Sequence, residues 1–73
     1  MIKYKAKLLH DIAEGVRRES KHRIESLEVV LVTPKGEEFS FSLEQALFAL
    51  ANDTHWDERG YWDEAETARV VVL

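Results

Sequence analysis

The sequence predicts a small single-domain α+β protein with two layers, in which two helices pack on a three- or four-stranded, mostly antiparallel sheet. Three observations lead to this class. With 73 residues, of which 45% are hydrophobic, the chain has enough apolar surface for one globular domain, residues 1–73, with a thin core. Two runs rich in β-branched and aromatic residues flank a turn signal. Other segments carry apolar residues at helical spacing.

The clearest predicted element is a β-hairpin around the turn Thr-Pro-Lys-Gly at residues 33–36. The fixed φ of proline suits the second position of a turn, and glycine can adopt the positive φ that closes it. We expect strands near residues 26–33 and 37–42. The first is largely apolar on both faces, which predicts an interior position in the sheet, whereas Phe39 and Phe41 share one face of the second.

A helix should follow the second strand directly. Ser42 and Gln45 have the spacing of a capping box, in which each side chain accepts a hydrogen bond from the other residue's backbone. Apolar residues then recur with the period of a helix, and Asn52 is the predicted end. The segment 66–73, Glu-Thr-Ala-Arg-Val-Val-Val-Leu, predicts a final strand, and its two apolar faces predict a place inside the sheet.

The first 22 residues allow two interpretations. Apolar residues alternate with Lys3, Lys5 and Lys7, as in a strand with one solvated face, which a helix capped at Asp11 would follow. The same segment also carries a helical stripe of apolar residues. The strand-first order βαββαβ is that of ferredoxin-like domains, and the helix-first order is αββαβ, with the last strand beside the hairpin. Three lysines near a helix N-terminus oppose the macrodipole, which favours the strand.

Composition excludes several classes of protein. Without cysteine, the chain has no disulfide, thiolate nucleophile or cysteine-bound metal. Apolar runs are at most six residues long and the N-terminus has no apolar signal segment, so we expect no membrane span and a cytoplasmic location. The net charge of −4 is unevenly divided. Residues 1–23 carry seven Lys and Arg against three acids, a net +4, whereas residues 24–73 carry three against eleven, a net −8. This asymmetry favours an electrostatically steered partner.

Residues 52–66 contain both tryptophans, a tyrosine and many acids, and we considered them first as a metal site. Aligned with an EF-hand loop that starts at Asp53, the stretch has acids at both ends and at Asp57 in between. Glu58 occupies the position that requires glycine, and His55 is a poor calcium ligand. A transition metal would need at least one more ligand from another part of the chain. We therefore expect no metal.

Catalytic patterns are equally weak. Paired carboxylates work as acid and base only where their environments differ, and the acids of this stretch lie in a polar loop. The sequence has no nucleophile elbow, dinucleotide fingerprint or phosphate-binding loop. A domain of this size also offers little depth for a pocket. We expect no enzyme activity, no catalytic residue and no cofactor.

The acidic aromatic stretch is more typical of a core element combined with a contact surface. At least one tryptophan can close a small core, while an exposed aromatic residue beside acids would attract a basic partner. The basic N-terminal segment could contact an acidic protein or phosphates. The expected partner-binding residues are Lys3, Lys5, Lys7, Arg17, Arg18, Lys21, Arg23, Trp56, Asp57, Glu58, Tyr61 and Trp62.

Together these features predict a small non-enzymatic regulatory or inhibitory protein, of the kind that phages and mobile elements encode. We expect a monomer that binds a larger host protein involved with nucleic acid, such as RNA polymerase or a nuclease, through charged surfaces. One alternative is a weak nucleic-acid-binding domain that uses the basic N-terminal segment. Another is a structural domain that oligomerises through the edge of the strand at Val70 to Leu73.

Overall fold

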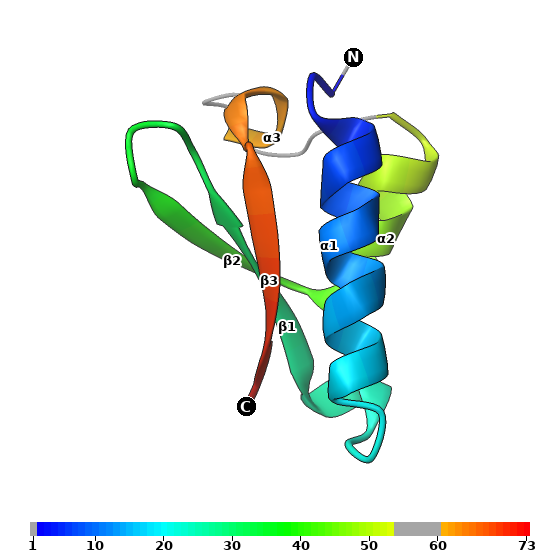
Figure 1. Cartoon of the computed structure of the whole chain (residues 1–73). Coiled ribbons are helices and arrows are strands. Elements are labelled where there is room, and N and C mark those ends of the chain that lie inside the picture. The colour runs from blue at the N-terminus through cyan, green and yellow to red at the C-terminus, as the bar shows by residue number, and fades with distance from the viewer. Residues whose placement is uncertain (1, 54–60) are drawn as a thin grey trace.

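Two helices pack on one face of a three-stranded antiparallel sheet (Figure 1). The computed structural model describes residues 2–53 and 61–73. The elements in chain order are α1 (Lys5–Arg18), the 3-10 helix η1 (Ile24–Ser26), β1 (Leu27–Val32), β2 (Glu38–Ser42), α2 (Leu43–Ala51), the short α3 (Tyr61–Glu64) and β3 (Thr67–Val72). The predicted α+β class is confirmed, in its helix-first form.

The N-terminal segment is a helix, so of the two interpretations left open for residues 2–9 the favoured strand is wrong and the helix is confirmed. Leu8, Ile12 and Gly15 are buried along one face of α1. Lysine near a helix N-terminus costs roughly 0.3–1 kcal/mol, whereas a fully buried aliphatic side chain contributes about 1.5–3 kcal/mol. Packing therefore outweighs the unfavourable dipole. Asp11, which the strand-first interpretation placed at the helix N-cap, lies in the second turn of α1 instead.

The strand order is β2-β1-β3, so β1 is central and β3 lies at an edge. The interior position predicted for the first strand is confirmed, and the one predicted for the last strand is wrong. The apolar character of β3 has another cause, because α1 packs closely against it. A Cβ atom added to Gly15 would lie 2.5 Å from Cγ2 of Val70. The Asp11 carboxylate also accepts a hydrogen bond from the backbone N–H of Ala68.

The local signals around the hairpin and α2 are confirmed. Gly36 has a φ of 86°, and its N–H donates to the Thr33 carbonyl over 2.9 Å. At the start of α2, the Gln45 N–H donates to Ser42 Oγ over 3.1 Å, and the Ser42 N–H donates to Gln45 Oε1 over 3.4 Å. The helix ends with Asn52 as its C-cap.

The core lies between the helices and the sheet, and Trp62 of α3 is its largest fully buried side chain. Its ring packs against Phe41, with 4.8 Å between the ring centroids. The expectation that at least one tryptophan belongs to the core is confirmed. Over the described ranges, no helix is both long and apolar enough to cross a membrane.

The opposite face of the sheet is not covered by any element of the described chain. An ion pair between Glu38 of β2 and Arg69 of β3, 3.0 Å long, spans the central strand on this face. Arg69 is the cross-strand neighbour of Val30, which is buried although it lies on this side of the sheet. Long charged side chains can cover apolar surface with their stems, and Arg69 is placed to do so beside Val30.

Candidate functional site

The helix α1 divides the predicted basic segment into two groups. Lys3, Lys5 and Lys7 lie at its start, and the remaining cations lie at its end and in the turn that follows. The rise of about 1.5 Å per residue separates Lys5 from Arg17 by about 18 Å along the helix axis. The single strand face of lysines that the sequence suggested is therefore absent, and the two groups form separate surfaces.

Most of the N-terminal group is engaged within the molecule. Lys7 forms an ion pair with Asp11 over 3.0 Å, and the ammonium group of Lys3 lies 5.3 Å from the centroid of the Tyr4 ring. Lys5 is half-buried. This group is the weaker candidate for a binding surface.

The C-terminal group is more accessible. Arg17 pairs with Glu14 over 2.8 Å. By contrast, Arg18, Lys21 and Arg23 are exposed, and no described acid lies within ion-pair distance of them. We refer to these three cations together with the adjoining Ile24 as the basic end.

The basic end also exposes apolar surface. The side chain of Ile24 is 60% exposed, and that of Leu73 is 74% exposed. Backbone bonds bring the two segments together, because the Leu73 N–H donates to the Ser26 carbonyl over 2.7 Å and the Ser26 N–H donates to the Arg23 carbonyl over 2.9 Å. The end of α1 and the C-terminus lie at the same end of the molecule (Figure 1). The exposed cations and aliphatic side chains therefore share that end.

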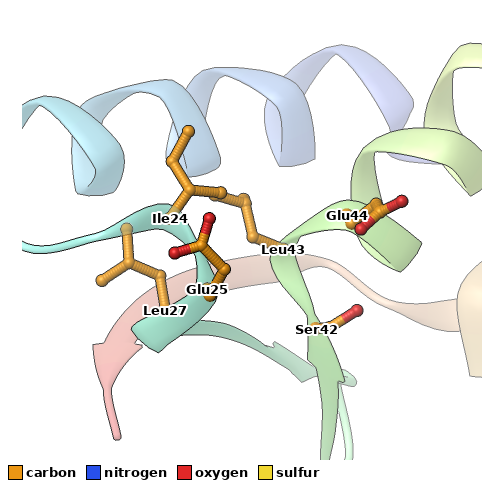
Figure 2. A pocket seen from close by; sticks show the side chains of 6 residues that line it. All are labelled: Ile24, Glu25, Leu27, Ser42, Leu43 and Glu44. Carbon is orange, nitrogen blue, oxygen red and sulfur yellow. The ribbon is translucent and has the colours of Figure 1, made fainter.

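A cleft of about 260 Å³ adjoins Ile24. Figure 2 shows that one side of it comes from η1 and the start of β1, and the other from the junction between β2 and α2. Its apolar wall consists of Ile24, Leu27 and Leu43, and its two charged residues are Glu25 and Glu44. The surface thus changes from positive to negative within two residues, between Arg23 and Glu25.

The lining of the cleft does not suit nucleophilic catalysis. Ser42 is its only hydroxyl-bearing residue, and Ser42 Oγ is occupied as the acceptor of the α2 N-cap bond. None of the six lining residues is a histidine that could serve as its base. The lining offers apolar contact and carboxylate charge.

The structure describes only part of the acidic aromatic stretch, residues 52–53 and 61–66. Trp62 was predicted as a contact residue, but its ring is 0% exposed and belongs to the core. Tyr61 is the first residue of α3. Trp56, Asp57 and Glu58, like the side chain of Tyr61, lie outside the described residues. Asp53, the first position of the EF-hand comparison, has a φ of 54° and accepts a hydrogen bond from the Ile2 N–H over 3.2 Å.

The sequence did not reveal the cleft. Its two sides are separated by about 15 residues of hairpin, and neither Glu25 nor Glu44 belongs to a recognisable motif. The only local signal was the capping box at Ser42, which fixes where α2 begins and so places Glu44 in the first turn. In residues 2–53 and 61–73, no group of three or more His, Asp or Glu side chains could hold a metal ion.

Comparison with known proteins gives no relative: no family model, curated protein or solved structure matches the chain. The basic end and the adjoining cleft are the candidate binding surfaces.

Proposed function

We propose that this chain is a small non-enzymatic regulatory or inhibitory protein that binds a larger protein through the basic end. The observation that carries the proposal is the exposure of Ile24 between three cations and an acidic cleft. A single exposed aliphatic residue is ordinary on a protein surface. Here Leu73 adds a second exposed apolar side chain, and the surrounding charges provide the polar rim that protein interfaces have.

A protein partner fits this end better than a phosphate backbone does. Nucleic-acid sites present a continuous positive surface, because each contacted phosphate is neutralised by Lys or Arg. At this end, the three cations would attract a phosphate, whereas the nearby carboxylates of Glu25 and Glu44 would repel the next one along the backbone. A folded partner can place an acidic residue opposite Arg23 and a basic residue opposite the carboxylates of Glu25 and Glu44.

The proposed mechanism is steric and electrostatic. The cations steer the encounter with an acidic area of the partner, and Ile24 excludes water from the centre of the contact. Binding would then block the surface that the partner uses for another molecule. Proteins that handle nucleic acid, such as RNA polymerase and nucleases, segregate strong charge on their surfaces, so they are the first class of partner to examine.

Affinity capture from an extract of the native cell tests this proposal, with bound proteins identified by mass spectrometry. The basic end is removed by Arg18→Glu combined with Arg23→Glu. The matched control is Lys35→Glu, because Lys35 is an exposed cation in the hairpin turn, at the opposite end of the molecule (Figure 1).

We expect a protein that wild type and the Lys35 variant capture equally and that the double variant does not capture. The purified partner should bind wild type directly. If the double variant retains every protein that wild type captures, the basic end is not the binding surface and the proposal is wrong.

The second candidate function is nucleic-acid binding by the same exposed cations. It is favoured by the lack of described acids within ion-pair distance of Arg18, Lys21 and Arg23. The two functions differ in their response to salt and to Ile24. Phosphate binding depends steeply on salt and does not need the aliphatic side chain, whereas the protein contact depends on both.

A further inference from the structure

The cleft beside Ile24 has the features of a site for one amphipathic cationic side chain. Leu27 and Leu43 form its floor, and both are almost fully buried, so the floor is apolar and fixed by the core. Ile24, Glu25, Ser42 and Glu44 are exposed and form the rim. Leu27 and Leu43 are each only 2% exposed, so the accessible aliphatic side chain of the lining is that of Ile24, beside the polar groups at the mouth.

The charge at the rim is entirely negative. Glu25 belongs to η1 and Glu44 to the first turn of α2, so two elements separated in the sequence each place a glutamate in the lining of the cleft, on opposite sides of Leu43 (Figure 2). Neither carboxylate forms an ion pair within the described part of the chain. At the N-terminus of α2, the capping box engages the Gln45 N–H, and Glu44 adds a carboxylate in the first turn. The rim is therefore complementary to a cation.

The size of the cleft limits the ligand to a single side chain. Pockets for small molecules and cofactors usually have about 300–1,000 Å³, and this cleft has about 260 Å³. Arginine and lysine place their apolar stems on aliphatic surface and keep the charged head near water. Arginine suits two carboxylates better than lysine does, because its planar guanidinium offers several N–H donors and is weakly hydrated.

We propose that the cleft binds an arginine side chain of the partner protein, with its stem against Ile24 and its guanidinium between Glu25 and Glu44. This inference rests on the proposed function, since the arginine belongs to the protein that docks on the basic end. It specifies the chemistry of that partner: an arginine lies next to the acidic residues that meet Arg18, Lys21 and Arg23. Both proteins would then carry a positive area next to a negative one. This pattern fixes the register of the contact and disfavours partners whose surface carries charge of one sign.

The direct test is an NMR titration of the full ¹⁵N-labelled chain with a short acetylated and amidated peptide, Ala-Arg-Ala. The comparison peptide carries citrulline, which has the same shape without the charge. We expect the arginine peptide to shift the amide signals of residues 24–27 and 42–44 and to bind about 5-fold more tightly than the citrulline peptide. Shifts elsewhere, or equal binding of the two peptides, would overturn the inference.

The variants Glu25→Gln and Glu44→Gln, combined, should remove the preference for arginine and leave the rest of the spectrum unchanged. Glu37→Gln combined with Glu64→Gln is the matched control, since both are exposed acids outside the cleft lining. Retained preference in the cleft variant, or loss of the preference in the control, would contradict the assignment.

The capture experiment separates this inference from the proposed function. If the partner is lost from the Arg18→Glu and Arg23→Glu variant but binds the cleft variant as tightly as wild type, the basic end is the binding surface and the arginine site is wrong. If no partner depends on the basic end while the peptide still selects the cleft, the arginine site stands and the docking surface must be sought elsewhere.

Discussion

The carboxylate of Asp11 in α1 accepts a hydrogen bond from the backbone N–H of Ala68 in β3, with 3.1 Å between Oδ2 and the nitrogen. β3 pairs with β1 on its other side, where the Leu73 N–H donates to Ser26. In an antiparallel ladder the N–H groups alternate in direction, so that of Ala68 points to the free edge. A helix side chain thus occupies a donor that an added strand would use, which protects this edge from further pairing.

Replacing Asp11 with alanine should destabilise the fold. The substitution leaves the Ala68 N–H without its partner in a place that α1 partly covers, which costs about 1–3 kcal/mol in the free energy of unfolding. Urea denaturation measures the loss. Glu14→Ala is the control, because it removes only the exposed pair with Arg17 and should cost at most about 0.5 kcal/mol. Equal losses for the two variants would show that the Ala68 bond contributes little.

Gly15→Ala should also destabilise the protein, although alanine normally favours a helix over glycine by about 0.8–1 kcal/mol. The new Cβ would lie 2.5 Å from Cγ2 and 2.6 Å from Cβ of Val70, and Cβ cannot move without the backbone. We expect a net loss of about 1–3 kcal/mol. Adding Val70→Ala should cost less in the Gly15→Ala background than in wild type, which a double-mutant cycle by urea denaturation would measure. Additive effects would contradict the close contact.

Trp62→Ala should be among the most damaging single substitutions, with a loss of about 3–5 kcal/mol, because it empties a fully buried site against Phe41. If this variant does not fold, fluorescence still tests the burial. In a Trp56→Phe variant, all tryptophan emission comes from Trp62, and iodide should quench it only slightly. Strong quenching would show that the ring is accessible to solvent.

Ser42→Ala should weaken the start of α2 by about 0.5–2 kcal/mol, because it removes the acceptor of the Gln45 N–H. Ser40→Ala is a close control, since Ser40 lies on the same strand, is exposed and has no side-chain hydrogen bond in the described structure. Thermal unfolding followed by circular dichroism would compare the two. A Ser40 effect as large as that of Ser42 would argue against the cap.

Salt titration should separate the two candidate functions. If the basic end binds DNA or RNA through three cations, the log–log slope of the binding constant against salt should be about −2 to −3. We expect no such binding of nucleic acid at physiological salt. With the captured protein, we expect the variant that combines Arg18→Glu and Arg23→Glu to associate about 10-fold more slowly than wild type at low salt. Steep salt-dependent binding of nucleic acid that the variant abolishes would favour the second candidate.

The local sequence determined those parts of the fold whose signals are complete within a few residues. The turn at Thr33 to Gly36 needs only proline and a glycine with positive φ, and the start of α2 needs only the Ser42 and Gln45 pair. The central position of β1 followed from its two apolar faces. The α+β class followed from these elements together.

Only the tertiary structure decided the N-terminal helix, the position of β3 and the candidate site. The alternation of residues 2–8 satisfies a strand as well as a helix, and burial of Leu8 and Ile12 against the sheet selects the helix. The apolar residues of β3 resemble those of an interior strand until Gly15 of α1 is seen packed against Val70. The cleft exists because pairing of β1 with β2 places η1 beside the start of α2, so that Glu25 and Glu44 line the same cleft. Each of these features depends on contacts between residues far apart in the chain, which local periodicity does not record.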